Sequence, residues 1–199
     1  MFYHLEGTVA EIGQNLAVIQ CGGIGFAVNV TVNTLAQIHP GEKAKLYISE
    51  AIGESNFDLY GFATKSEKRC YEMLVSVSGI GPKAALSILS YNTPESLALS
   101  IMNDDAKALT VAPGIGKKIA QRVILELKDK ISKETDMLDM SRPVQSVPVS
   151  GDHTVNDALA ALTVLGYSSV EIAPVLKTLD VTGMSAEQII KAVLKQMVR

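Results

Sequence analysis

Short apolar runs separated by glycine-containing turns dominate the first 63 residues of the chain. The runs are rich in Val, Ile, Phe and Tyr, a composition typical of β-strands. Five strands are expected, at residues 2–10, 16–21, 24–30, 44–49 and 57–62. Gly22 and Gly23 predict a tight hairpin between the second and third strands, because glycine supplies the positive φ of such turns. With a short helix at 34–38, before the fourth strand, this pattern predicts a small closed barrel of the oligonucleotide-binding type.

From Thr64 the apolar residues follow a helical period instead. Thr64 and Glu67 predict a capping box, in which each side chain satisfies a free backbone amide at a helix start. Pro94 suits the first position of a later helix, where its missing N–H costs nothing. Residues 64–131 are therefore expected to form a compact all-α domain. Four breaks divide it into short helices, at residues 78–81, 91–94, 103–104 and 113–116.

Helical periodicity is lost at residues 132–153, where two prolines, several serines and mixed charge predict a flexible linker. Helical patterning then returns, with two further capping boxes at Ser168–Glu171 and Ser185–Gln188. This last part is expected to form a small three-helix bundle. The predicted fold class is multidomain α+β: a barrel at 1–63, a helical domain at 64–131, a linker at 132–153 and a bundle at 154–199.

The helical domain contains an internal repeat. Residues 78–85 (SGIGPKAA) recur 35 positions later at 113–120 (PGIGKKIA). In each copy an apolar helix ends at Gly-Ile-Gly and a new helix begins at once, so each copy is predicted to be a helix-hairpin-helix. The two glycines allow a sharp turn, and the isoleucine anchors it in the core. The free amides at the start of the next helix, together with the positive end of its dipole, can then bind a phosphate oxygen.

Basic residues follow each hairpin at matched positions. Lys83 and Lys118 occupy the same place in the two copies, Lys117 adds a charge to the second, and Arg122 lies one turn beyond Lys118. A single Gly-x-Gly before a helix is most often only a helix cap, but two copies with matched lysines favour binding to the nucleic-acid backbone, without reading sequence. The predicted DNA-binding residues are Gly79, Ile80, Gly81, Lys83, Gly114, Ile115, Gly116, Lys117, Lys118 and Arg122.

The formal net charge of −3 would by itself argue against a polyanionic partner. The charge is unevenly distributed, however: residues 1–63 carry −4, residues 64–131 carry +3 and residues 132–199 carry −2. The basic block coincides with the doubled hairpin, which supports the prediction of a nucleic-acid interface there.

Other sites are not expected. The chain contains no apolar run of the ~20 residues that cross a membrane, and its N-terminus has no secretion signal, so a cytoplasmic protein with reduced Cys21 and Cys70 is expected. The three histidines are isolated and lack metal-ligand spacing. Neither a nucleotide-binding P-loop, nor a nucleophile elbow, nor a cofactor fingerprint occurs. We therefore expect no metal, no cofactor and no catalytic residue.

The order of the motifs closely resembles the RuvA family, the junction-binding subunits of the bacterial Holliday junction branch-migration complex. The resemblance rests on LYGF at the end of the barrel, then GIGPK, PGIGKK and a final LGY. It implies a non-catalytic homotetramer, or an octamer, that holds a four-way junction open. It further implies a hexameric RuvB-type ATPase docked on the C-terminal module, a RuvC-type resolvase in a larger complex, and a role in recombination, DNA repair and the SOS response.

Members of this family carry an acidic pin a few residues before LYGF, usually made of two adjacent carboxylates. The pin sits at the crossover of the four-way junction and helps to separate the DNA strands. Here Glu54 falls on the first of these positions and Ser55 on the second, so the chain departs from the pattern. Glu50 or Asp58 would supply the other negative charge if the loop were shifted. The alternative is that these acids belong to an ordinary solvated turn.

For motor docking, candidate residues in the last module are Leu165, Tyr167, Ile172 and Leu176. Most of them are expected in the core, because so small a module needs nearly all its apolar residues inside. Two other functions fit the hairpins. One is an enzyme such as a glycosylase or nuclease that uses them to hold DNA. The other is a protein-only adaptor in which Gly-Ile-Gly merely caps helices.

Overall fold

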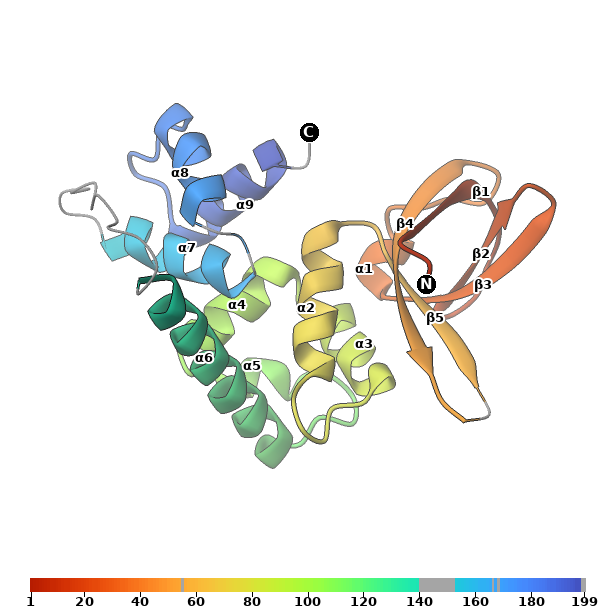
Figure 1. Cartoon of the computed structure of the whole chain (residues 1–199), viewed down its shortest axis with the longest axis horizontal. Coiled ribbons are helices and arrows are strands. Elements are labelled where there is room, and N and C mark those ends of the chain that lie inside the picture. The colour runs from red at the N-terminus through yellow and green to blue at the C-terminus, as the bar shows by residue number, and fades with distance from the viewer. Residues whose placement is uncertain (55, 140–152, 166, 168, 198–199) are drawn as a thin grey trace. The chain divides into compact units, whose positions relative to one another are not determined.

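The computed structural model describes residues 1–54, 56–139, 153–165, 167 and 169–197. The chain divides into two compact units. The first comprises Met1–Pro94 and Val111–Ile115, and the second comprises Glu95–Thr110 and Gly116–Arg199. All the strands drawn in Figure 1 belong to the first unit. This unit also contains the whole first Gly-Ile-Gly turn and the second turn as far as Ile115.

The N-terminal part of the first unit is a closed five-stranded barrel with the order β1-β2-β3-β5-β4, as the sequence predicts. Neighbouring strands are antiparallel except β3 and β5, which pair in parallel. Gly22 and Gly23, with φ of 55° and 89°, form the predicted hairpin turn. The strands are β1 His4–Ile12, β2 Leu16–Cys21, β3 Ile24–Val30, β4 Lys43–Ile52 and β5 Phe57–Phe62.

Two strands differ from the prediction. β1 continues past its predicted end at Ala10, because the register shifts between Val9 and Glu11 and a bulge of this kind lets a strand continue around a barrel. β4 extends to Ile52, because its ladder with β5 runs to the last pair, Ile52 with Phe57. The β4–β5 hairpin is therefore longer than expected, and Figure 1 shows it projecting beyond the rest of the barrel.

The barrel core comes from alternate strand positions, because successive strand residues point to opposite faces. Val28 and Val30 on β3, like Leu46 and Ile48 on β4, are buried in this way. The buried cluster comprises Leu5, Val9, Ala17, Ile19, Val28, Val30, Ile38, Leu46, Ile48 and Leu59.

A buried carboxylate joins the barrel to the first helix of the hairpin region. Helix α1 (Val32–Leu35) begins earlier than predicted, because the Thr31 hydroxyl accepts the Thr34 amide at 2.9 Å. The Thr31 hydroxyl also donates to Glu67 of helix α2 (Lys65–Val75), and the Thr34 hydroxyl donates to the same carboxylate at 2.7 Å. Glu67 is buried, and its backbone amide donates to the Thr64 hydroxyl at 3.2 Å. This hydrogen bond confirms the contribution of Thr64 to the predicted capping box.

The remaining helices of the predicted helical domain are α3 Pro82–Tyr91, α4 Pro94–Met102, α5 Ala106–Leu109 and α6 Lys117–Asp139. The predicted break after α4 occurs at Asp104, whose φ is 55°. The prediction that the linker begins at residue 132 is wrong, because α6 continues to Asp139. The rest of the predicted linker, residues 140–152, lies outside the described residues.

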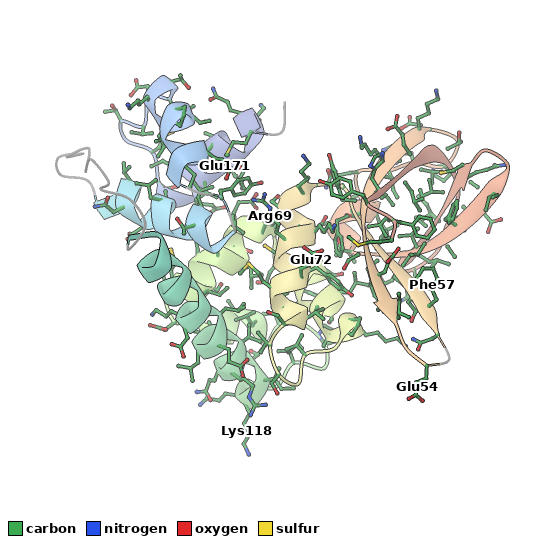
Figure 2. The ribbon with its side chains drawn as sticks, viewed as in Figure 1. Glu54, Phe57, Arg69, Glu72, Lys118 and Glu171 are labelled. Carbon is green, nitrogen blue, oxygen red and sulfur yellow. The ribbon has the colours of Figure 1, made fainter. Side chains whose placement is uncertain are left out.

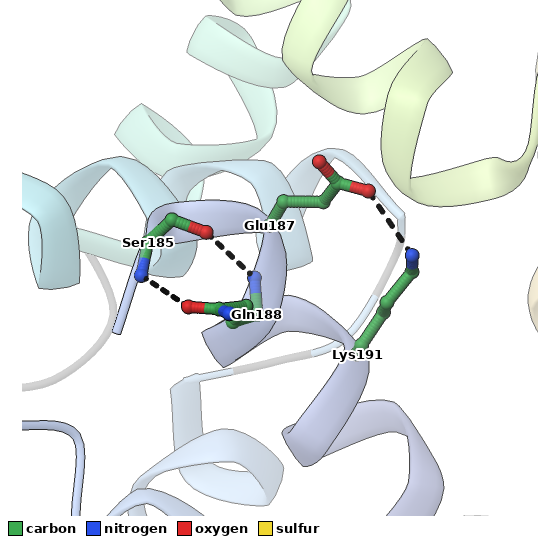
Figure 3. A network of polar contacts seen from close by, with 4 residues as sticks. All are labelled: Ser185, Glu187, Gln188 and Lys191. Atoms are coloured by element: carbon green, nitrogen blue, oxygen red, sulfur yellow. Dashed lines mark hydrogen bonds and ion pairs between the residues drawn. The ribbon is translucent and has the colours of Figure 1, made fainter. Parts of the chain in front are cut away.

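Three further helices follow: α7 His153–Val164, α8 Ser169–Thr178 and α9 Ala186–Met197. The most amphipathic is α9, which buries Ile189, Ile190, Val193 and Leu194. Its start is the predicted capping box: the Ser185 amide donates to the Gln188 side chain at 2.9 Å, and the Gln188 amide donates to the Ser185 hydroxyl at 3.3 Å (Figure 3). Ser168 of the other predicted box lies outside the described residues.

Candidate nucleic-acid interface

The first Gly-Ile-Gly turn connects α2 to α3. Gly79 has φ of 87°, which L side chains rarely adopt, so glycine is required there. The Ile80 amide donates to the Val77 carbonyl at 3.0 Å, and the Ile80 side chain is buried. The turn is thus closed by one backbone hydrogen bond and anchored by one apolar side chain, as the sequence predicts.

The second turn repeats this geometry at the predicted spacing. Gly114 has φ of 83°, and buried Ile115 donates its amide to the Ala112 carbonyl at 3.1 Å. The helices that follow also begin alike: the Ala85 amide bonds Gly81 and the Ala120 amide bonds Gly116, both at 3.0 Å. The two copies therefore share these two backbone hydrogen bonds at matching positions.

The second glycine of each turn has a different role from the first. Gly81 has φ of −88°, which any residue can adopt, and Gly116 is not among the glycines with positive φ. Apart from its two chain neighbours, a Cβ at either position would meet no protein atom within 4 Å. Neither backbone conformation nor internal packing explains glycine here. The space beside each one adjoins the start of a helix, where first-turn amides have no partner within the helix and the dipole is positive.

The predicted basic residues are exposed beside these helix starts. Lys83 follows Gly81 on α3, and Lys117 and Lys118 begin α6; Figure 2 shows the Lys118 side chain pointing away from the ribbon. In the part of the chain that the structure describes, none of the three lysines forms an ion pair. Arg122 differs, because its Nε lies 3.8 Å from the Glu126 carboxylate, one turn further along α6.

Lys83 also lines a cavity of about 480 Å³ in the first unit. The cavity lining comes from α3, from the barrel region and from Pro113. Ser87 joins α3 to the second turn by donating to the Pro113 carbonyl at 3.0 Å. The sequence did not suggest this cavity, because its lining residues are far apart in the chain and share no motif. Besides Lys83 they include Gln14, Asn15, Asn29, Tyr60, Ser87, Tyr91 and Pro113.

The β4–β5 hairpin carries the candidate acidic pin. Its turn is closed by a hydrogen bond from the Gly53 amide to the Asn56 carbonyl at 2.9 Å. Glu54 is exposed at the tip, where Figure 2 shows its side chain pointing away from the barrel. Ser55 lies outside the described residues. Glu54 is thus the candidate acid that the structure places at the tip.

The loop shift that would bring Glu50 or Asp58 to the tip does not occur. Glu50 pairs with Leu59 and Asp58 pairs with Ala51, both within the ladder. Glu50 is only 12% exposed, lies 3.8 Å from the N-terminal ammonium and accepts the Phe2 amide. Asp58 is half-buried and accepts the Asn56 side-chain amide at 2.9 Å. Both residues therefore lie within the ladder and not at the tip, and each carboxylate has a partner.

Two buried tyrosines lie near Asp58. The rings of Tyr60 and Tyr71 stack with centroids 5.2 Å apart. Burial raises the pKa of Tyr60, and the charge of Asp58 raises it further. Burial likewise raises the pKa of Tyr71 well above its ordinary value, with smaller contributions from Tyr60, Asp58 and Glu72. Both phenols remain neutral at physiological pH and add no charge behind the hairpin.

The structure buries three of the four candidate docking residues: Leu165, Tyr167 and Ile172. Leu176 is half-buried. This burial agrees with the expectation that most of them form the module's core. No cluster of three or more metal-binding side chains occurs within the described ranges. In the same ranges, none of the helices is both long enough and apolar enough to span a membrane.

Comparisons with known proteins cover the whole chain. Three family models match: the RuvA N terminal domain at residues 1–61, the SAM-like helix-hairpin-helix tandem at 71–129, and the RuvA C-terminal domain at 154–198. The chain is 40% identical to a protein of Ruminiclostridium cellulolyticum, an alignment that covers 99% of this chain and all of the relative. It is 41% identical to one of Thermoanaerobacter sp. and 38% to one of Acetivibrio thermocellus, with complete coverage of both chains in each case. Each relative is named Holliday junction branch migration complex subunit RuvA.

Proposed function

Because the chain belongs to the RuvA family, we propose that it binds four-way DNA junctions through their phosphate backbone and holds them open for a motor that drives branch migration. The observation that supports this most directly is the open space beside Gly81 and Gly116. A phosphate that approaches either glycine can accept hydrogen bonds from the amides of the following helix, and an exposed lysine lies within the same first turn.

Each hairpin offers one phosphate site, and such contacts hold DNA by its backbone without reading its bases. Pro82 has no N–H, so the first site has one backbone amide fewer than the second, where Lys117 takes its place. Lys83 and Lys118 contribute by releasing counterions from the DNA, and Lys117 adds a third charge to the second site. Arg122 has Glu126 as a partner, so we assign it a smaller share of the binding.

We further propose that the tip of the β4–β5 hairpin lies at the crossover, where the Glu54 carboxylate repels phosphates and favours separation of the strands. In this proposal Glu50 and Asp58 are structural, because both lie in the β4–β5 ladder and their carboxylates have partners, the N-terminus for Glu50 and the Asn56 side chain for Asp58. The pin then carries one described carboxylate instead of the usual adjacent pair.

The C-terminal module, α7 to α9, is proposed to dock a hexameric RuvB-type ATPase. The side chains of Leu165, Tyr167 and Ile172 are buried, so they would support docking indirectly, by packing the core of the module. Leu176 is partly accessible and could contact the ATPase directly. The full assembly would be a cytoplasmic homotetramer, or an octamer, joined by a RuvC-type resolvase. This chain would be its non-catalytic DNA-binding subunit.

The proposal is tested by Gly81→Ala and Gly116→Ala, singly and together, in binding assays with a labelled four-way junction. Each Cβ fills space that no protein atom occupies, so the free energy of unfolding should change by less than about 1 kcal/mol. Each methyl would displace a phosphate from charge-assisted hydrogen bonds of about 1.5–3 kcal/mol, which predicts at least ~10-fold weaker binding per site.

Gly13→Ala is the matched control, because its Cβ would make only an ordinary contact of 3.5 Å with Leu16, and it lies in a turn of the barrel. Unchanged junction binding by the Gly81→Ala, Gly116→Ala double variant would overturn the phosphate-site proposal. Junction cleavage by the purified wild-type chain in Mg²⁺, with no other protein, would support the nuclease alternative instead.

A further inference from the structure

Two large apolar side chains are exposed where the β4–β5 hairpin ends. Ile52 is 74% exposed and Phe57 is 54% exposed. They are direct cross-strand partners in the last pair of the ladder, so both lie on the same face of the hairpin. Figure 2 shows Phe57 on the arm that leads back from Glu54 at the tip. The two side chains form one apolar surface immediately behind the turn.

The barrel makes little use of this surface. Phe57 contacts the Phe2 ring, with centroids 6.3 Å apart, but more than half of its side chain remains exposed. Single exposed apolar residues are common on proteins, whereas contiguous exposed apolar surface is a candidate for binding.

The chemistry of the tip fits a nucleobase better than a phosphate or a protein. The Glu54 carboxylate repels phosphate, but it can accept hydrogen bonds from the amino groups on base edges. The faces of a base are apolar and stack on side chains such as Phe, and Phe and Ile are among the residues that proteins wedge between base steps. Two side chains are also far fewer than the ~20–30 residues that each partner contributes to a standard protein interface.

We propose that Ile52 and Phe57 form an apolar wedge that packs against unpaired nucleobases at the crossover of a four-way junction. The inference rests on the proposed function, because that function places the hairpin tip at the crossover. In this arrangement Glu54 keeps the phosphates away, and the wedge replaces the stacking that bases lose when they separate. Stacking on a side chain changes the equilibrium between open and paired bases by about 5- to 150-fold.

Photo-crosslinking tests the placement. 5-Iodouracil is built into a junction either at the crossover or midway along an arm, and the full-length wild-type protein is irradiated with each. Cross-linked peptides are then identified by mass spectrometry. We expect the crossover probe to attach to the β4–β5 hairpin at Phe57, and the arm probe to give no attachment there. Attachment of the crossover probe only to residues outside this hairpin would overturn the proposal.

Base opening tests the role. A 2-aminopurine at the crossover is quenched while it is stacked between paired neighbours, and its emission should rise when the wild-type protein binds. The Ile52→Ala, Phe57→Ala double variant should bind the junction but lose most of this rise. Ile24→Ala is the matched control, because Ile24 is also an exposed isoleucine at a strand end, 62% exposed, next to a different turn.

The outcomes separate this inference from the function on which it rests. If the wild-type protein fails to bind the junction at low salt, the proposed function fails. If the double variant binds and retains the full rise in emission, the wedge alone is wrong. A double variant whose mass in solution without DNA differs from that of the wild type, and which keeps the rise, would identify the surface as a contact between copies of the chain and overturn the wedge.

Discussion

Replacing Lys83 and Lys118 together by alanine should weaken junction binding and also make that binding less sensitive to salt. Both side chains are exposed, and neither forms an ion pair among the described residues, so removing them should change the free energy of unfolding by no more than about 0.5 kcal/mol per site. A loss of affinity would then report on the contact with DNA and not on the fold.

The magnitude follows from counterion release. Each phosphate contact contributes about 0.9 to the slope of log K against log salt concentration, so losing two contacts lowers the slope by about 1.8 per bound protomer. Between 50 and 200 mM salt, the wild-type protein should therefore lose about 12-fold more affinity per protomer than the double variant. At high salt the two proteins should converge.

A gel-shift or fluorescence-anisotropy titration of a labelled junction at four or more salt concentrations measures this slope. Lys128→Ala with Lys191→Ala is the matched control: it also removes two positive charges, but these ammonium groups already contact Asp104 at 2.6 Å and Glu187 at 3.1 Å. If the control lowers the slope as much as the Lys83, Lys118 variant, bulk charge explains the binding. If neither variant changes the slope, the hairpin lysines do not contact phosphate and the reasoning is refuted.

Three further predictions concern stability, each measured by chemical or thermal unfolding. Glu67→Ala should destabilise the first unit by about 1–3 kcal/mol, because it leaves two buried hydroxyl groups without their acceptor, and Glu67→Gln should recover part of this loss. Ser185→Ala should cost about 0.5–2 kcal/mol by removing the N-cap of α9, with little effect on junction binding. Burial raises the pKa of Tyr71, because it favours the neutral phenol in the folded protein. The stability that Tyr71 contributes is therefore complete below the unfolded-state pKa of about 10 and is lost as the pH rises above that value. Tyr71→Phe should reduce this loss of stability at alkaline pH, and an alkaline unfolding profile equal to that of the wild type would contradict the prediction.

The hairpins could be predicted from sequence because short-range contacts determine them. The turn at Gly79 depends on one hydrogen bond between residues three apart and on one buried isoleucine, and the same holds at Gly114. Such features are visible as motifs. The closed barrel was also predictable, because five strand-like runs with a short helix before the fourth correspond to a known order.

Features that depend on distant residues or on context were not predictable. Glu50 was a candidate for the pin, but the folded barrel brings the N-terminal ammonium and the Phe2 amide to its carboxylate. The end of α6 was missed because the segment up to Asp139 is rich in Lys, Glu and Asp, a composition that suits an exposed helix as well as a linker. The cavity beside Lys83 combines segments that no local pattern connects.

The structure also changes what the barrel's negative charge can do. The sequence assigns −4 to residues 1–63, but two of these acids form ion pairs. Glu6 lies 3.7 Å from Lys45, and Glu50 is held by the N-terminus. At the hairpin tip Glu54 is exposed, and neutralising it should therefore affect strand separation at the crossover more than neutralising Glu50. Glu54→Gln compared with Glu50→Gln in the 2-aminopurine assay tests this difference: a larger effect of Glu50→Gln, in a protein that remains as stable as the wild type, would contradict a tip-centred pin.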